Sequence, residues 1–136
     1  MIRIRLKKRM NLIGAIVVVL NKEKDILILK RPNWVHWGAS KWAFPGGKIE
    51  DNESSLDAAI RETKEETNLD VRDLEVLELD LDIPIAAYYT STYSGEVRLD
   101  FEHDDWAWTS RDEIEGYDLA PDVLAMYDWV LENERK

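Results

Sequence analysis

The chain has 136 residues, a length typical of one domain with a two- or three-layer core, and we predict a single domain over residues 1–136. Its net charge of −10 argues against a general nucleic-acid-binding protein, because such proteins depend on a basic face to bind phosphates. It contains no cysteine, which excludes disulfides and thiol catalysis and is typical of the reducing cytoplasm, where we expect this protein.

The first thirty residues contain three short segments with strand-like patterns. Residues 2–6 alternate Ile and Leu with Arg3 and Arg5, which predicts an edge strand; a phosphate- or partner-binding arm is the alternative. Residues 14–20 and 26–30 are apolar runs around a polar turn and predict a buried hairpin.

The basic start and the apolar run superficially resemble a secretory signal. We predict no membrane segment, since a cleavage site is lacking and the run is about half of the roughly 20 residues that span a bilayer.

Residues 54–67 have the pattern of an amphipathic helix. Ser54 is followed three positions later by Asp57, which predicts a capping box at the helix start. A core-facing stripe at helical spacing is formed by Leu56, Ala59, Ile60, Thr63 and Thr67. Three acids separated by three and four positions share another face, namely Glu62, Glu65 and Glu66.

Those three like charges destabilise a bare helix by roughly a few tenths of a kcal/mol per pair. A divalent cation would relieve the repulsion, and oxygen ligands without cysteine suit Mg²⁺ or Mn²⁺. Most glutamate-rich helices instead carry their acids as a solvated surface, and the neighbouring Arg61 and Lys64 fit that alternative. The acids alone therefore leave both interpretations open.

The rest of the chain alternates strand-like and helix-like patterns. Residues 74–83 alternate leucines with acids, which predicts a strand. Residues 85–93 and 96–101 predict a hairpin, and residues 106–109 a further strand. Apolar residues at helical spacing predict a second helix over residues 120–134. Strands flanked by two helices predict an α/β domain, a three-layer α/β/α sandwich with a mixed β-sheet.

Residues 47–69 place a glycine, a glutamate, an Arg-Glu pair and a Glu-Glu pair at fixed distances. These residues are Gly47, Glu53, Arg61, Glu62, Glu65 and Glu66. Their spacing resembles the signature of the Nudix hydrolase family, G-x5-E-x7-R-E-U-x-E-E-x-G-U, where U is a bulky aliphatic residue. Six such matches arise by chance on the order of once in ten million starting positions, given ordinary residue frequencies.

The sequence departs from that signature at two positions. Thr63 replaces an aliphatic residue, and its methyl group still faces the core stripe. Asn68 replaces the glycine after the helix, where a left-handed conformation is expected; Asn is the best non-glycine residue there. The same reasoning applies to Asn52, so we expect neither asparagine to disturb the backbone.

The resemblance implies the Nudix fold and MutT-type pyrophosphohydrolase activity. It implies catalytic roles for Glu53, Arg61, Glu62, Glu65 and Glu66, with Arg61 pairing with Glu53 to hold the loop against the helix. The implied metal ligands are the Gly46 carbonyl, Glu62, Glu65 and Glu66. A further acid is expected from a downstream loop, where Glu102 is the first choice and Asp104 and Asp105 are alternatives. The resemblance does not assign the general base.

The residues around the motif suggest how a substrate binds. Arg31 could reach a phosphate, and an aromatic ring could stack on a base at Trp34, Trp37 or Tyr88. The other tryptophans that we assign, all expected in the core, are Trp42, Trp108 and Trp129.

The expected partner is a nucleotide-type small molecule bound with Mg²⁺ or Mn²⁺. The expected reaction is hydrolysis of a nucleoside diphosphate linked to a variable group. The first-choice substrate is a nucleoside triphosphate, which would be cleaved to monophosphate and pyrophosphate. ADP-ribose, nucleotide sugars and dinucleoside polyphosphates are alternative substrates. A non-catalytic nucleotide-binding or regulatory domain is an alternative of another class, although it would be expected to have lost some of the glutamates. A homodimer is left open.

Overall fold

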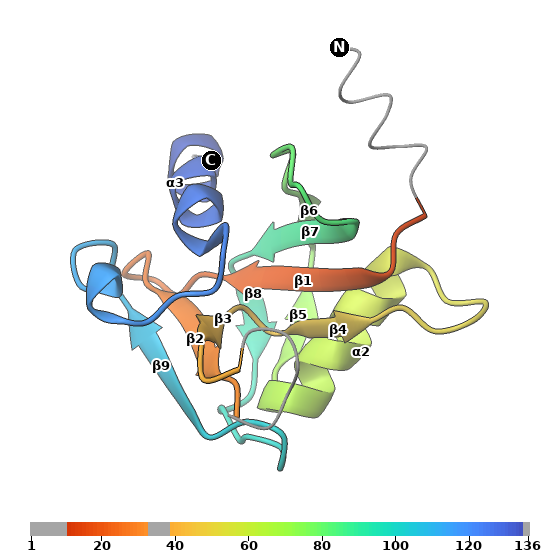
Figure 1. The fold of residues 1–136 in the computed structure, drawn as a ribbon, viewed down its shortest axis with the longest axis horizontal. Helices are drawn as coiled ribbons and strands as arrows, with labels where there is room; N and C mark the ends of the chain where they lie inside the picture. The colour runs from red at the N-terminus through yellow and green to blue at the C-terminus, as the bar shows by residue number, and fades with distance from the viewer. Residues whose placement is uncertain (1–10, 33–38, 135–136) are drawn as a thin grey trace.

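A computed structural model describes residues 11–32 and 39–134 of the chain. The predicted edge strand at residues 2–6 and the two tryptophans Trp34 and Trp37 lie outside the described residues. The elements are β1 (Gly14–Val19), β2 (Ile26–Lys30), β3 (Trp42–Ala43), β4 (Gly46–Lys48), α2 (Ser55–Thr67), β5 (Asp70–Arg72), β6 (Glu75–Val76), β7 (Ile85–Thr90), β8 (Thr92–Ser94), β9 (Asp105–Thr109), a 3₁₀ turn η1 (Ile114–Gly116) and α3 (Val123–Asn133) (Figure 1). Within the described ranges, no helix is long and apolar enough to cross a membrane.

The main sheet has the strand order β4-β1-β7-β6. Its central strand β1 is antiparallel to β4 and parallel to β7, so the sheet is mixed, as predicted. A second sheet has the order β3-β2-β9, and β5 pairs with β8. The parallel β1–β7 pairing requires a long crossover, and the chain between these two strands includes β4 and α2.

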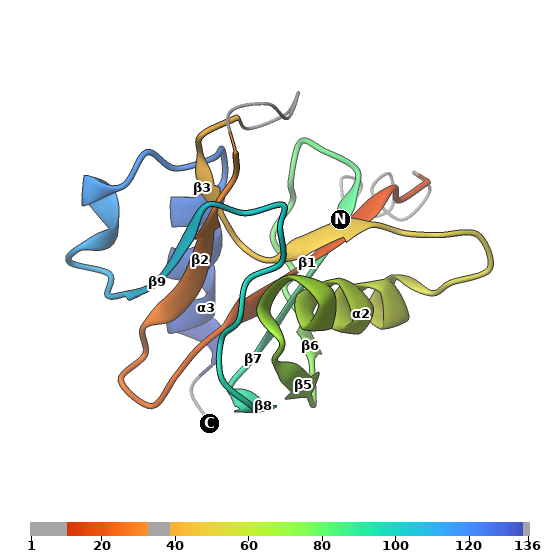
Figure 2. The same ribbon diagram turned by 90° about the horizontal axis from the view of Figure 1, so that it is seen from below.

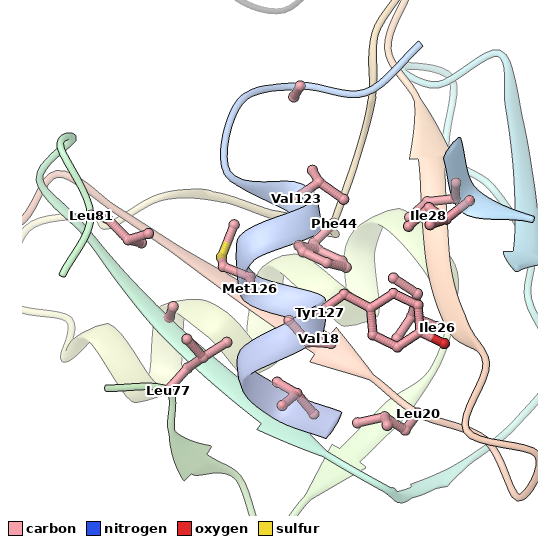
Figure 3. Packing of buried hydrophobic residues seen from close by; sticks show 14 residues of the cluster. Val18, Leu20, Ile26, Ile28, Phe44, Leu77, Leu81, Val123, Met126 and Tyr127 are labelled. Carbon is pink, nitrogen blue, oxygen red and sulfur yellow. The ribbon is translucent and has the colours of Figure 1, made fainter. Parts of the chain in front are cut away.

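The two helices lie on opposite sides of the sheets. On β1, Ala15, Val17 and Val19 pack in one cluster with residues of α2, whereas Val18 packs in another cluster with residues of α3. Figure 3 shows the second cluster, where Met126 and Tyr127 of α3 lie against strand side chains. Because successive strand side chains point to opposite faces, a strand that is apolar throughout needs cover on both sides. This arrangement confirms the predicted three-layer α/β/α sandwich.

The predicted hairpin of residues 14–20 and 26–30 is wrong in its pairing. Strands β1 and β2 form at the predicted positions but belong to different sheets, and they meet only at the bridge between Leu20 and Ile26. Each strand takes two other neighbours, β4 and β7 for β1, and β3 and β9 for β2. An apolar run gives the burial of a strand on both faces, but it does not specify which strand lies beside it.

Two further strand predictions are corrected. Of residues 74–83, only Glu75–Val76 forms a strand, although the alternation persists in the burial of Leu77 and Leu81. Residues 96–101 form no strand, and β8 pairs with β5 instead. The Arg98 amide donates to the Thr67 carbonyl, which ties this segment to the end of α2. The predictions of a strand at residues 106–109 and of a C-terminal helix are confirmed by β9 and α3, although α3 begins at Val123.

Helix α2 begins and ends as its sequence predicts. The Ser54 hydroxyl accepts from the Asp57 amide at 3.0 Å, and Asn68 ends the helix with φ 71° in the left-handed region. Asn52 is also left-handed, with φ 64°. One stripe residue is corrected: Leu56 is 40% exposed, because the helix turns Ala58 and Ala59 toward the sheet.

Replacing Ser54 with alanine should lower the free energy of unfolding by about 1 kcal/mol, because the Asp57 amide loses its acceptor. Urea denaturation monitored by circular dichroism measures the loss. The control Ser54→Asp keeps an acceptor and should remain close to the wild type. Equal losses in both variants would contradict the capping role.

Candidate functional site

Strand β4 brings two consecutive glycines against the main sheet and helix α2. A Cβ atom at Gly46 would overlap the Ala15 carbonyl of β1, and one at Gly47 would overlap the Glu62 carboxylate. The strand and the helix lie side by side in Figure 2. These two glycines therefore allow a close approach of backbone to backbone and of backbone to carboxylate, which places Glu62 beside β4.

The close contact at Gly47 leads to a stability prediction. Gly47→Ala should lower the free energy of unfolding by about 1–3 kcal/mol, because the added methyl group collides with the Glu62 carboxylate. Thermal unfolding measures the loss. Gly116→Ala is the matched control, since a Cβ there meets nothing within 4 Å. Equal stability of Gly47→Ala and the wild type would show that the Glu62 carboxylate moves aside at little cost and is not held firmly against β4.

Arg61 and Glu53 form a bidentate ion pair that connects the loop after β4 to α2. Arg61 Nε donates to Glu53 Oε2 at 2.7 Å, and Nη2 donates to Glu53 Oε1 at 3.0 Å. Nη2 also donates to the Lys48 carbonyl at 3.0 Å, while Glu53 Oε1 accepts from the Glu50 amide. The hydrogen bond from Arg61 lowers the pKa of Glu53 to about 2. The pairing implied by the family resemblance is thus present.

Glu62 and Glu66 form a second pair, which is much less accessible to water. Glu66 is 5% exposed, and its Oε1 accepts from the Gly46 amide at 3.0 Å. Burial, together with the nearby Glu62, raises the pKa of Glu66 to about 9, and burial also raises the pKa of Glu62. The two carboxyl groups lie close enough to affect each other's pKa, and the raised pKa values favour a protonated carboxyl in this pair.

Glu65 differs from this pair. Its side chain is 57% exposed, and its Oε1 accepts from Arg61 Nη1 at 3.1 Å. The same Nη1 donates to Glu62 Oε2, also at 3.1 Å. Arg61 therefore holds Glu62 and Glu65 from one side.

Among the residues that the structure describes, no three Asp, Glu or His side chains are grouped closely enough to hold a metal ion.

The loop between β8 and β9 brings another carboxylate to the buried pair. Asp100 is close enough to Glu66 to raise its pKa. Asp100 Oδ1 lies 2.9 Å from His103 Nδ1 and accepts from the Glu102 amide at 3.2 Å. The sequence interpretation missed Asp100; the available signal was a histidine three positions after it.

The expected further acid, Glu102, is exposed, as are Asp104 and Asp105. The role of Glu102 as a metal ligand stays a prediction. The same holds for the Gly46 carbonyl. Figure 2 shows the loop passing beside the end of α2 before it reaches β9. The Asp104 amide donates to the Lys30 carbonyl, so the loop is also attached to the end of β2.

The expected substrate residues are spread over several elements. Arg31 follows β2, and its amide donates to the Lys41 carbonyl. Tyr88 lies on β7, and its hydroxyl is 2.7 Å from that of Ser55 at the start of α2. The structure therefore places Tyr88 beside the first turn of the helix. Three other tryptophans, predicted in the core, are partly buried and pack against the two clusters from outside: Trp42, Trp108 and Trp129.

The Glu62–Glu66 pair fits a hard divalent cation. It offers oxygen donors only, it is poorly accessible to water, and it holds two acids close together, which raises the pKa of both. Mg²⁺ commonly binds proteins through one or two carboxylates and completes its ligands with water and substrate phosphates. The arrangement can thus hold a cation against a polyphosphate, while the Arg61–Glu53 pair fixes the loop.

Comparison with known proteins gives the same family as the motif. The profile of the NUDIX domain matches residues 10–130. An 8-oxo-dGTP diphosphatase of Proteus vulgaris is 39% identical over 72 residues, which cover 53% of this chain and 62% of that protein. A CTP pyrophosphohydrolase of Escherichia coli is 28% identical over 118 residues, which cover 82% of this chain and 86% of that protein.

The fold gives the same result. A solved structure from work on MutT of Aliivibrio salmonicida and Vibrio cholerae has a TM-score of 0.74 at 21% identity and covers 88% of this chain and 96% of that one. At this identity the likeness concerns the fold. Together with the profile match and the signature at residues 47–69, it shows that the chain belongs to the NUDIX domain family.

Proposed function

We propose that the protein is a Mg²⁺-dependent pyrophosphohydrolase that cleaves a nucleoside triphosphate to the monophosphate and pyrophosphate. The observation that carries the proposal is the buried Glu62–Glu66 pair beside Gly46 and Gly47, with every glutamate of the signature present. A domain retained only to bind a ligand has no need for two acids that repel each other away from water. The two relatives described above are named for nucleoside triphosphate substrates, which supports this substrate class.

The proposed roles follow from the contacts of each residue. Glu62 and Glu66 hold the cation, and Asp100 or Glu102 adds a carboxylate from the loop. Bound Mg²⁺ neutralises charge on the phosphates and lowers the pKa of water. Arg61 and Glu53 position the loop, and Arg61 also holds the Glu65 carboxylate near the pair. In the reaction, a water oxygen attacks one phosphorus, the bridging P–O bond breaks, and a carboxylate of the site takes the water proton.

A panel of nucleotides tests this proposal. The wild type is incubated with MgCl₂ and 8-oxo-dGTP, CTP, ADP-ribose or a dinucleoside tetraphosphate, and the products are separated by ion-exchange chromatography. We expect monophosphate and pyrophosphate from at least one triphosphate, and a fall of about 100-fold in Glu66→Gln. If only ADP-ribose or only the tetraphosphate is cleaved, the proposed substrate class of nucleoside triphosphates is wrong. Binding without cleavage of any compound would favour a regulatory domain.

A further inference from the structure

A groove runs along β7, between this strand and residues 76–81, and the candidate substrate residue Tyr88 is one of its lining residues. Its volume is about 420 Å³, and Leu12 and Ser55 also line it. The apolar side chains along it are Leu12, Val76, Leu77, Leu79, Leu81 and Ile85. Val76 is 58% exposed and Leu12 is 37% exposed, whereas Leu77 and Leu81 are buried, so the apolar surface that faces water comes mainly from Val76 and Leu12. Exposed apolar surface gathered in a groove is typical of a binding site.

The groove has an acidic border. In residues 75–82, acids alternate with leucines, so the leucines contribute to the floor and the acids lie beside them. The acids that line the groove are Glu78 and Asp80, and both are exposed. A ligand that fits this surface would be an extended segment with apolar side chains on one face and basic side chains on the other.

The chain itself contains a segment with that pattern. Residues 2–6 read Ile-Arg-Ile-Arg-Leu, and three more basic residues follow at positions 7–9. This segment is joined to the groove by a short length of chain, since Leu12 is one of the lining residues. Ten extended residues reach about 33–36 Å, and a short tether raises the effective concentration to the order of millimolar.

We propose that residues 2–6 bind in this groove, with Ile2, Ile4 and Leu6 against the apolar floor and Arg3 and Arg5 against the acidic border. The occupant is thus the protein's own N-terminal segment. Its basic residues neutralise acids of the same chain rather than forming an arm for nucleic acid. Binding there covers Val76 and extends the packing beside Ser55 and Tyr88, which lie at the start of α2.

Disulfide trapping tests the proposal cleanly, because the chain has no cysteine of its own. Full-length variants pair Ile4→Cys with Val76→Cys or with Leu79→Cys. The matched control pairs Ile4→Cys with Asp112→Cys, an exposed position between β9 and η1, away from β6 and β7 (Figures 1 and 2). Disulfides need Cα atoms within about 7 Å, so mild oxidation at low protein concentration reports on proximity.

We expect a disulfide-linked monomer in at least one groove pair, formed at least about tenfold faster than in the control pair. A disulfide-linked dimer would show that the groove takes a second copy and would overturn the proposal. Failure of both groove pairs, or equal rates in the groove and control pairs, would also overturn it. Mass spectrometry of the digested protein identifies the linked peptides.

A charge reversal tests the electrostatic part separately. Glu78→Lys with Asp80→Lys should slow the trapping of the groove pair about fivefold at low salt, because like charges then face each other. Adding Arg3→Glu and Arg5→Glu to the same chain should restore the rate. An unchanged rate after the first pair of substitutions would contradict the role of the arginines.

Discussion

Glu66→Gln should make the metal-free protein more stable at pH 8 while lowering activity by about 100-fold. Glutamine keeps the shape of the side chain; its carbonyl can accept from the Gly46 amide and its NH₂ can donate to Glu62. What is removed is a buried acid, 5% exposed, whose pKa is raised to about 9. Thermal unfolding in the presence of a chelator measures the stability, and triphosphate cleavage with Mg²⁺ measures the activity.

The gain should depend on pH in a defined direction. The folded pKa of Glu66, about 9, lies above the ordinary unfolded value of about 4.3, so the folded state binds its proton more tightly. The wild type therefore has its full stability from this group below about pH 4.3 and loses it progressively as the pH rises through 9. The advantage of Glu66→Gln should be small at pH 4.5 and should grow steadily as the pH rises toward 9.

Glu65→Gln is the matched control for this prediction, because Glu65 is on the same helix but is 57% exposed. At pH 8 this variant should not show the stability gain expected of Glu66→Gln. A Glu66→Gln variant that is less stable than the wild type at pH 8 would contradict the raised pKa of the buried Glu66 carboxyl. Full activity in that variant would contradict the role of the pair in holding the cation.

Arg61→Lys should lower the melting temperature by about 5 °C and reduce activity at least about tenfold. A lysine cannot reproduce the bidentate pair with Glu53 while also donating to the Lys48 carbonyl and to Glu62. The loop would then be held less firmly against α2, and the positions of the carboxylates would change. Thermal unfolding and steady-state kinetics measure the two effects.

The surface offers a matched control in Arg111, which also makes a two-atom contact, to Asp128, and a third contact, to Glu115. Arg111→Lys should leave the activity unchanged and cost less stability, because exposed ion pairs contribute little. Equal losses of activity in the two variants would show that Arg61 acts only through general stability.

Arg61→Lys should also move the acid unfolding of the protein to higher pH. The reason is that Glu53, whose pKa of about 2 depends on Arg61, contributes stability above its unfolded pKa that is lost as the pH falls through 2.

The sequence predicts the local features that depend on one residue and its near neighbours. The cap at Ser54, the left-handed turns at Asn52 and Asn68 and the ion pair of Arg61 with Glu53 all follow from spacing or from the signature. The layers also follow, because apolar runs that need cover on both faces predict helices on both sides. The cap, the left-handed turns and the ion pair all lie within residues 52–68.

Features that depend on distant pairing were not predictable in the same way. The alternation in β1 and β2 determines which side chains are buried, but the choice of neighbours depends on strands far along the chain. The buried state of Glu66 depends on β4, which brings the Gly46 amide to its carboxylate. Asp100 reaches Glu66 only because residues 96–98 are tied to the end of α2 rather than forming a strand.

Isotope labelling of the products tests the central claim most directly. The wild type is incubated with Mg²⁺ and the triphosphate that it cleaves best in H₂¹⁸O, and mass spectrometry locates the label. Cleavage of a phosphoric anhydride places one ¹⁸O atom on a phosphorus of either the monophosphate or the pyrophosphate, with Glu66→Gln forming little product. The label on a sugar carbon, or equal product from the wild type and Glu66→Gln, would contradict a pyrophosphohydrolase that works through this carboxylate pair.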